Sequence, residues 1–358
     1  MKVVAHNGAT IWGGAERATT RLLAGLKSRG HEVLLLCNSP VVVTKAEDHG
    51  VPAMHLVIGG DLQLHHAFRL KRALDETGPD AFIVGTYKKL FLATLGARKA
   101  GVPRIVARVG LQSDTPRSWK YKVALRRWTD AVVANSTMIA ESFKVAGVPR
   151  ERIAVIHNGV NALTRVKDTF TARRELGLPD NAVVIGTAAR LSIQKRIDRL
   201  VEAVALLPDN VHCIVAGEGT RRADIERLIR ENRLTSRFHL LGHCESLRDF
   251  LSALDVYVVS SDSEGLSNSM LEAMTLGIPV VSTDVSGADD ALIGGRDSQS
   301  GGLIVERNPV AIADAVRKML NDAELRETMG AAAKEKAIRD FALDKMLDEW
   351  EAFLSAPA

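Results

Sequence analysis

Short apolar runs, rich in β-branched residues, alternate along this chain with amphipathic helical stretches. Strands that are apolar on both faces and alternate with helices form parallel sheets that helices cover on both sides. Right-handed crossovers connect such strands. The candidate strands fall into two series, the first at 2–6, 32–37, 81–85, 104–108, 131–135 and 153–157, the second at 183–189, 212–217, 238–242, 256–261 and 279–283. We therefore predict an α/β protein with two Rossmann-like domains.

A polar stretch without a strand pattern separates the two series. It reads NALTRVKDTFTARRELGLPD at 161–180 and ends in Gly-Leu-Pro. We expect one domain at 1–165 and a second at 166–337, which suits a chain of 358 residues because a domain usually holds about 100–200. The remaining segment, 338–358, carries an amphipathic helical pattern over 338–354. We predict that this helix packs against another part of the molecule, since its apolar face needs a partner.

Composition argues against several classes of protein. A content of 46% hydrophobic and 25% charged residues is typical of a soluble globular chain. The start, MKVVAHNGATIWGG, lacks the apolar region of a signal peptide, and no run reaches the roughly 18 apolar residues of a membrane span. Cys37, Cys213 and Cys244 lie far apart, outside any metal or redox spacing. These features predict a cytoplasmic protein with reduced thiols.

Charge is distributed unevenly along the chain. Residues 1–160 hold 23 Lys and Arg against 12 Asp and Glu, a net charge of +11, whereas the remainder has a net charge of −7. The first half therefore favours an anionic partner. Nucleic acid, an anionic membrane surface and a phosphorylated lipid are candidates. We expect no nucleic acid, because the chain shows no nucleic-acid motif.

The first turn between strand and helix reads HNGATIWGGAER and lacks the GxGxxG spacing. This counts against a nicotinamide dehydrogenase, in which those glycines let a pyrophosphate approach the helix. Gly13 and Gly14 nonetheless precede a helix, where backbone N–H groups and the helix dipole favour an anion. The alternative is a tight turn in which Glu16 is a favourable first-turn acid.

Two loops of the second series carry further candidates. Arg190 and Lys195 follow the strand at 183–189, and the carboxyl ends of parallel strands are where open α/β sheets bind ligands. Arg as a fork and Lys as a point charge can together neutralise a diphosphate, although a solvated basic loop is the alternative. Gly217-Glu218-Gly219 follows the next strand, and a plain turn explains these glycines equally well.

The stretch DSEGLSNSMLE at 262–272 lies between a strand and a helix. Glu264 falls in the loop and can accept hydrogen bonds from hydroxyl groups, while the N–H groups of 265–269 face an anion at the helix start. Glu272, one turn further, can reach a second pair of hydroxyls. The pair Ser269 and Glu272 also fits a capping box. Two carboxylates around an anion site suit a sugar nucleotide, which has hydroxyls at both ends and phosphate between them.

The chain resembles the retaining, nucleotide-sugar-dependent glycosyltransferases of family 4, which have the GT-B fold. The resemblance rests on the order and spacing of several motifs: GGAER (13–17), NGV (158–160), ARLSIQKRIDRLVEA (189–203), GEG (217–219), EGLSNSMLEAMTLGIPVVSTDVSG (264–287) and GGLIV (301–305). It implies an N-terminal acceptor domain and a C-terminal donor domain that face each other across a cleft. It also implies that the closing helix crosses back to the first domain.

The resemblance implies roles for individual residues. Arg190 and Lys195 would hold the diphosphate and stabilise it as it leaves, Glu264 would contact the donor sugar, and these three form the catalytic set. The implied donor-binding residues are Gly13, Gly14, Gly217, Glu218, Gly265, Leu266, Ser267, Asn268 and Glu272. Fixed cations would replace a metal in such an enzyme. We therefore expect no metal and no cofactor, with a UDP- or GDP-sugar as substrate; Asp262-Ser263-Glu264 is only a poor imitation of a metal motif.

The acceptor side departs from the family pattern. Many relatives carry a histidine after the N-domain strand where this chain has Arg108, Val109 and Gly110, and we place Glu16 and Arg108 on the acceptor side. The basic, aromatic stretch at 115–129 contains Arg117 and Trp119, and we expect it to meet an anionic membrane surface on the inner face of the plasma membrane. In that stretch Tyr121, Leu125 and Trp128 share one helical face and belong to the core in the alternative reading.

The predicted function is transfer of a sugar, in the manner of a hexosyltransferase, to a saccharide or lipid-linked acceptor. The resemblance suggests bacterial-type cell-surface polysaccharide or lipopolysaccharide synthesis. A sugar-nucleotide epimerase and a non-catalytic sugar-nucleotide-binding paralogue are the alternatives, because fold does not fix function.

Overall fold

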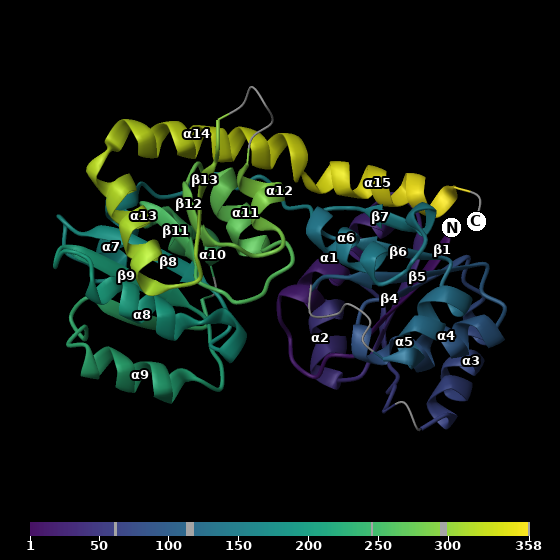
Figure 1. The fold of residues 1–358 in the computed structure, drawn as a ribbon. Coiled ribbons are helices and arrows are strands. Elements are labelled where there is room, and N and C mark those ends of the chain that lie inside the picture. Colours follow the sequence, from purple (N-terminus) through teal and green to yellow (C-terminus); the bar gives the residue numbers. More distant parts are fainter. Residues whose placement is uncertain (61–62, 112–117, 245, 294–298, 357–358) are drawn as a thin grey trace. The chain divides into compact units, whose positions relative to one another are not determined.

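The computed structural model describes residues 1–60, 63–111, 118–244, 246–293 and 299–356. The chain forms two compact units, coloured along the sequence in Figure 1: Met1–Gly159 with Leu343–Ala358, and Val160–Ala342. The boundaries expected from the sequence, 165 and 337, lie six and five residues from those of the structure. No described helix is long and apolar enough to cross a membrane.

The first unit is one parallel sheet with helices on both faces. Its described strands are β1 (Lys2–Asn7), β2 (Glu32–Cys37), β3 (Ala53–His55), β4 (Ala81–Val84), β5 (Arg104–Val109), β6 (Ala131–Ala134) and β7 (Ile153–Val155). Its described helices and turns are α1 (Gly14–Ser28), α2 (Pro40–Asp48), α3 (His65–Thr77), η1 (Tyr87–Lys89), α4 (Leu90–Lys99), α5 (Trp119–Val123), η3 (Ala124–Trp128), α6 (Thr137–Val145), η4 (Arg150–Arg152) and α15 (Leu343–Ser355). One core lies between the sheet and α3, α4, η3 and α6, and the other between the sheet and α1, α2 and α15.

The second unit repeats this plan. Its described strands are β8 (Val183–Ala188), β9 (Val211–Ala216), β10 (Phe238–Gly242), β11 (Val256–Val259), β12 (Val280–Thr283) and β13 (Gly302–Val305). Its described helices and turns are α7 (Thr169–Glu175), η5 (Ile193–Lys195), α8 (Ile197–Ala205), α9 (Arg222–Glu231), α10 (Leu247–Ser252), α11 (Asn268–Thr275), α12 (Ala288–Leu292), α13 (Pro309–Asn321) and α14 (Ala323–Asp340). Helices α8, α9 and α13 cover one face, and α7, α10, α11, α12 and α14 cover the other.

Strand order locates the edge where each sheet can bind a ligand. The orders are β3-β2-β1-β4-β5-β6-β7 and β10-β9-β8-β11-β12-β13, so each sheet changes direction of growth once, at β1/β4 and at β8/β11. The strand pairs are parallel throughout. Open α/β sheets bind ligands at the carboxyl ends of the strands beside such a switch point. The predicted α/β class and the two Rossmann-like domains are confirmed.

The sequence pattern missed two strands, each at a sheet edge. β3 is three residues long and largely exposed, so it carries no apolar run that a pattern could reveal. β13 begins at Gly302, where an added Cβ would lie 2.1 Å from the carbonyl oxygen of Val280. This strand therefore depends on close backbone approach to β12 rather than on large side chains.

The predicted helix at 338–354 is wrong in one respect. The helical stretch is broken at Phe341 and Ala342, so that α14 ends at Asp340 in the second unit and α15 begins at Leu343 in the first. Phe341 is buried in the core of the second unit, whereas Trp350 is buried between α15 and the first sheet. The predicted return of the chain to the N-terminal domain is present in α15, which packs on α1 (Figure 1).

Candidate functional site

The candidate site of the second unit lies where β8 and β11 end, beside the switch point of its sheet. The loop after β8 carries Arg190 and Lys195, and the loop after β11 carries Glu264. The two strands are neighbours in the sheet, so both loops emerge at the same edge. The structure thus brings Lys195 and Glu264 together, and it places Arg190 in the same loop as Lys195.

Three hydrogen bonds fasten these two loops to each other. The backbone N–H of Asp262 donates to the carbonyl oxygen of Gln194 (2.9 Å), and the side chain of Gln194 donates to the carbonyl oxygen of Ser263 (2.6 Å). The hydroxyl of Ser260 donates to the carbonyl oxygen of Lys195 (2.9 Å). The N–H of Asp262 and the carbonyl oxygens of Gln194, Ser263 and Lys195 thus find partners within the protein, and these bonds fix the two loops to each other.

Asp262 adds a charged clamp to the same pair of loops. Its carboxylate accepts hydrogen bonds from Arg196 (3.0 Å) and from Arg199 (2.6 Å). Arg199 is almost fully buried and also donates to the carbonyl oxygen of Ser260 (2.7 Å). Burial alone would raise the pKa of Asp262, but the hydrogen bonds from Arg199 and Arg196 hold that pKa below its usual value. Asp262 therefore acts as a structural anion rather than as a ligand for a metal.

Arg196 has an unusual backbone conformation for this role. Its φ of 50° lies in the left-handed region, which costs a residue other than glycine about 1–2 kcal/mol. This conformation ends η5 and begins α8 at one residue. Its guanidinium also pairs with Asp198 in the first turn of α8. The ion pairs with Asp262 and Asp198 offset part of the backbone cost.

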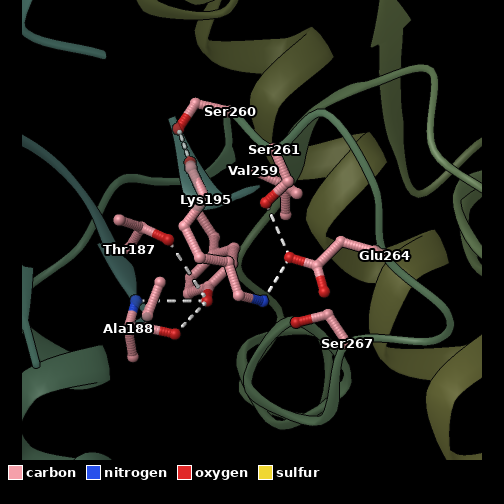
Figure 2. A pocket seen from close by; sticks show the side chains of 10 residues that line it. Thr187, Ala188, Lys195, Val259, Ser260, Ser261, Glu264 and Ser267 are labelled. Carbon is pink, nitrogen blue, oxygen red and sulfur yellow. Dashed lines mark hydrogen bonds and ion pairs between the residues drawn. The ribbon is translucent and has the colours of Figure 1, made fainter. Parts of the chain in front are cut away.

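Lys195 and Glu264 form an ion pair inside the recess between the loops (Figure 2). The same carboxylate oxygen of Glu264 accepts a hydrogen bond from the hydroxyl of Ser261 (2.6 Å). Both Glu264 and Ser261 are buried, whereas Lys195 is partly exposed. With the pair closed, the recess has a volume of about 10 Å³, roughly the space that one water molecule needs. A ligand group larger than water can enter this recess only by displacing the ammonium group or the carboxylate.

Arg190 lies five residues before Lys195 in the same loop and differs from it in exposure and pairing. It is exposed, and no described residue forms an ion pair or a side-chain hydrogen bond with it. A guanidinium has five N–H donors and a fixed fork geometry that matches a phosphate. The loop after β8 thus offers two cations. Arg190 is open to an anion, and Lys195 is paired with Glu264.

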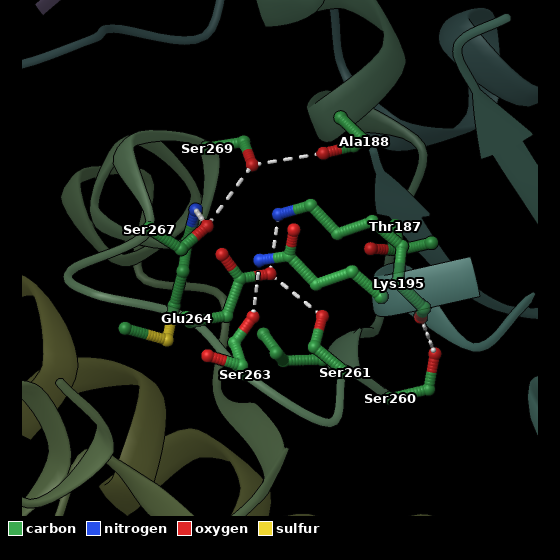
Figure 3. Close-up of polar contacts among 12 residues, drawn as sticks. Thr187, Ala188, Lys195, Ser260, Ser261, Ser263, Glu264, Ser267 and Ser269 are labelled. Atoms are coloured by element: carbon green, nitrogen blue, oxygen red, sulfur yellow. Dashed lines mark hydrogen bonds and ion pairs between the residues drawn. The ribbon is translucent and has the colours of Figure 1, made fainter. Parts of the chain in front are cut away.

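The helix that follows Glu264 has its N-cap at Ser267, two residues before the Ser269 that the predicted capping box requires. Ser267 is the N-cap of α11, and its side chain accepts from the N–H of Met270 (3.4 Å). Ser269 donates instead to the carbonyl oxygen of Ala188 (2.9 Å) at the end of β8, as Figure 3 shows. The predicted box of Ser269 and Glu272 is therefore wrong, because Ser269 ties the helix start to the neighbouring strand.

Tyr257 of β11 completes this tie. Its hydroxyl lies 2.7 Å from that of Ser269 and accepts from the N–H of Ala188 (3.2 Å). The residue is fully buried, and burial raises the pKa of Tyr257. The remaining predicted donor-binding residues of this segment continue from the loop into α11: Gly265 and Leu266 are buried, and Ser267, Asn268 and Glu272 are partly exposed.

Gly217 and Gly219 serve the packing of one loop on another. An added Cβ at Gly217 would lie 2.1 Å from the carbonyl oxygen of Ala189, and one at Gly219 would lie 2.2 Å from that of Leu191. The glycines therefore let this loop support the backbone of the loop that carries Arg190. Glu218 between them is exposed and pairs with Arg222 (2.8 Å). These contacts account for the motif as a structural turn.

The first unit holds the remaining predicted residues at the carboxyl edge of its own sheet. Gly13 is the N-cap of α1 and Gly14 its first residue, as the sequence predicts. Glu16 lies in the first turn and is buried. Arg108 near the end of β5 donates to Thr19 (3.0 Å) on α1.

The aromatic stretch is divided between the core and the surface. Leu125 is fully buried, and Tyr121 and Trp128 pack against the same core, which confirms their shared apolar face. Trp119 is 66% exposed. Arg117 lies outside the described residues.

Sequence reasoning missed the residues that hold the site rather than face a ligand. Asp262 was weighed only as part of a metal motif, and Gln194, Arg199, Ser260 and Tyr257 were not singled out. Arg196 and Arg199 lie three residues apart at a helix start, but this local spacing does not identify the distant acid that they share. In the part of the chain that the structure describes, no group of three or more His, Cys, Asp or Glu side chains could hold a metal ion.

Two family models match the chain, one for each unit. Residues 12–162 match "Glycosyltransferase Family 4", and residues 168–336 match "Glycosyl transferases group 1". The lipopolysaccharide core biosynthesis glycosyltransferase LpsE of Rhizobium meliloti is 31% identical over 64% of this chain and 65% of that protein, slightly less than two thirds of its length. The GDP-mannose-dependent alpha-mannosyltransferase of Mycobacterium tuberculosis is 24% identical over 98% of this chain and 96% of that protein.

Solved structures share the fold over the whole chain. Anabaena Alr3699/HepE in complex with UDP and glucose has a TM-score of 0.87 at 23% identity and covers 99% of both chains. The lipopolysaccharide outer core galactosyltransferase WaaB has a TM-score of 0.72 at 19% identity and also covers 99% of both. This likeness confirms the predicted GT-B fold.

We expect replacement of Asp262 by Asn to destabilise the protein at neutral pH by about 1–3 kcal/mol, because Arg199 would lose its carboxylate while remaining buried. The folded-state pKa of Asp262 is lowered, so its stabilisation is present above about pH 4 and is lost as the pH falls through the folded-state pKa. Urea unfolding followed by circular dichroism at pH 7 and pH 3 measures this. The difference between wild type and variant should shrink at pH 3.

The matched control is Asp314→Asn, which breaks an exposed ion pair with Arg317. Such pairs contribute less than about 1 kcal/mol, so this variant should unfold almost like the wild type at both pH values. An Asp262 variant as stable as this control at pH 7 would contradict the proposed clamp.

Proposed function

The chain belongs to glycosyltransferase family 4, and we propose that it is a retaining enzyme that moves a sugar from a nucleotide-diphosphate sugar to a saccharide or lipid-linked acceptor. The observation that carries this proposal is the group of charges at the β8/β11 switch point. Arg190 is open to an anion, and Lys195 of the same loop is paired with Glu264. Together the loops after β8 and β11 supply two positive charges and one carboxylate at one edge of the sheet.

Diphosphate binding has a clear consequence for this arrangement. A bound diphosphate takes two fork hydrogen bonds from Arg190 and attracts the ammonium group of Lys195 away from Glu264. The freed carboxylate of Glu264 then accepts hydrogen bonds from the hydroxyls of the donor sugar, with Ser261 still in place. Donor binding thereby replaces the ion pair between Lys195 and Glu264 with two new contacts, one from Lys195 to the diphosphate and one from Glu264 to the sugar hydroxyls.

The two cations also stabilise the transition state. As the bond between the anomeric carbon and the phosphate oxygen breaks, negative charge grows on the leaving diphosphate. Arg190 and Lys195 meet that charge in a geometry fixed in advance by the Asp262 clamp, which is how preorganised groups lower a barrier. In a retaining reaction the acceptor hydroxyl attacks from the same face, and the leaving phosphate takes its proton.

The donor and the cellular role follow from the relatives by analogy. A UDP-sugar is our first choice of donor and a GDP-sugar the second, since one structural relative binds UDP and one curated relative is named for GDP-mannose. Curated relatives named for lipopolysaccharide core and capsular polysaccharide biosynthesis favour a role in cell-surface polysaccharide synthesis. Such synthesis would place the protein in the cytoplasm, where nucleotide sugars are made available.

The alternatives make different products. An epimerase alters the donor sugar without an acceptor, whereas a binding paralogue returns the donor unchanged with every acceptor. Named relatives that are transferases do not favour either alternative. Product analysis after incubation with the donor alone separates the three.

We expect Glu272→Ala to abolish sugar transfer and to weaken nucleotide binding, because this partly exposed carboxylate on α11 is our proposed partner of the ribose. A thermal-shift panel of UDP-, GDP-, ADP- and CMP-sugars measures binding, since a ligand of the native state raises Tm. In the wild type one nucleotide should give the largest shift, and in the variant that shift should be lost. Glu324→Ala, at an exposed acid on α14, is the control and should keep it. Full transfer by the Glu272 variant would refute this site.

We infer a second contact, between the N-terminal unit and an anionic membrane surface. Trp119 is exposed, and so are Lys122, Arg126 and Arg127 in the same stretch of the chain. A large aromatic ring among cations is the arrangement that binds an interface carrying anionic lipid, with roughly 1 kcal/mol for each cation near the surface. The net charge of +11 in residues 1–160 supports the same contact.

Liposome sedimentation tests this contact. We expect the wild type to sediment with vesicles that contain anionic lipid and not with neutral vesicles, and Trp119→Ala to reduce the bound fraction severalfold. The control is Phe170→Ala, at an exposed aromatic residue of α7 that lies against Arg174 in the second unit. Equal and negligible binding of the wild type to both kinds of vesicle would end this proposal.

A further inference from the structure

Two opposite charges of the first unit lie near each other without forming an ion pair. Glu16 lies in the first turn of α1 and is only 6% exposed, yet its carboxylate has no hydrogen bond or ion pair with any described residue. Its oxygens therefore keep their acceptor positions for water or for a ligand.

Arg108 is the nearby cation. It lies in β5 next to the strand's last residue and is half-buried. Its guanidinium donates to the hydroxyl of Thr19 (3.0 Å) and to the side-chain oxygen of Asn158 (2.9 Å), both neutral groups. Two of its five N–H donors are thus used within the described residues, and the fork is held in one orientation.

Arg108 and Glu16 interact electrostatically although they form no ion pair. Burial lowers the pKa of Arg108 to about 10, and the negative charge of Glu16 opposes that shift, so the guanidinium stays charged at neutral pH. Thr19 explains why the pair does not close. It lies three residues after Glu16 on the same helix face, and it holds Arg108 while donating to the carbonyl oxygen of Ala15 (3.0 Å). Arg108 is therefore anchored one turn away from the carboxylate that attracts it.

The strand ends around these charges bring further polar groups to the same edge. β4 lies between β1 and β5 and is followed by Gly85, where an added Cβ would lie 3.2 Å from the carbonyl oxygen of His6 and 3.5 Å from the hydroxyl of Thr19. Asn7 ends β1 and Asn135 follows β6, and both are buried. The amide nitrogen of Asn7 and the amide oxygen of Asn135 have no hydrogen-bond partner among the described groups. Four unlike polar functions therefore share one sheet edge.

We propose that this edge binds a saccharide that carries an acidic group, with Arg108 holding the carboxylate or phosphate and Glu16 accepting from a neighbouring hydroxyl. The orientation follows from charge, because an anionic group placed at Glu16 would be repelled. A neutral sugar could serve Glu16 but would leave the half-buried guanidinium without a counter-ion. This inference rests on the proposed function, under which the acidic saccharide is the acceptor. Arg108 then determines acceptor specificity.

The test measures binding of small sugars without any donor. Ligand-observed NMR titrations compare glucuronate with its uncharged methyl ester, and glucose 6-phosphate with glucose, so that the two acidic groups are distinguished. In the wild type at least one acidic sugar should bind about tenfold more tightly than its neutral counterpart, the size expected for charge-assisted hydrogen bonds. Arg108→Met should abolish that ratio, and Arg108→Lys should restore part of it. Arg150→Met, at an exposed arginine of η4, is the control and should leave the ratio unchanged.

Fold and donor binding are checked on the same preparations by circular dichroism and by the shift in Tm with a nucleotide sugar. If Arg108→Met fails to fold, Arg108→Lys carries the test, since it keeps the charge and loses the fork. No preference for either acidic sugar in the wild type, or a preference that persists in a folded Arg108→Met, would overturn the inference. Because the titration contains no donor, that result would leave the proposed transfer reaction standing. Loss of the nucleotide shift in the wild type would instead contradict the proposed function.

Discussion

The carboxylate of Asp262 is the group on which the geometry of the second unit's site depends. It joins Arg196, at the end of the loop after β8, and the buried Arg199 of α8 to the loop that carries Glu264. Without it, the buried Arg199 would lose its carboxylate, and the left-handed backbone of Arg196 would lose one of the two ion pairs that offset its cost. Because both loops are fixed in this way, Lys195 and Glu264 can face each other in the recess between them.

The two units use opposite charges differently. In the second unit Lys195 and Glu264 are closed into an ion pair, and a ligand must open it. In the first unit Thr19 and Asn158 hold Arg108 away from Glu16, so the charges are already apart. A closed pair costs less in the absence of ligand and shields the site, whereas a separated pair is ready to bind but is costly to maintain. The first arrangement suits a ligand with several charges, and the second suits one with a single charge.

Much of the fold could be read from the sequence because long buried strands and amphipathic helices leave a strong pattern. The edge strands β3 and β13 left none, since one is short and exposed and the other depends on backbone approach at Gly302. The break at Phe341 was hidden because both halves of the stretch are amphipathic helix. The hydrophobic pattern of a sequence shows that a stretch is an amphipathic helix, but it does not show which domain core each part of the stretch packs against.

The site was predictable to a similar extent. Arg190, Lys195 and Glu264 follow strands that pair in the sheet, so their meeting at one edge could be anticipated. The clamp could not be anticipated. In the sequence Asp262 resembles a metal-binding residue, and its partners Arg196 and Arg199 approach it only in the folded chain. The capping box at Ser269 failed for the same reason: local spacing allowed it, but the carbonyl of Ala188, from a different strand, binds the hydroxyl instead. Tertiary contacts overrode a local preference at both positions.

The central claim is that the β8/β11 edge binds a diphosphate through Arg190 and Lys195. Isothermal titration calorimetry of UDP or GDP, each against its own nucleoside, tests it most directly in the wild type and in Arg190→Met. Our account predicts that the variant loses about tenfold or more in affinity for the nucleoside diphosphate and nothing for the nucleoside. Arg227→Met, at an exposed arginine of α9, should bind like the wild type. Unchanged affinity of Arg190→Met for the diphosphate would contradict the account.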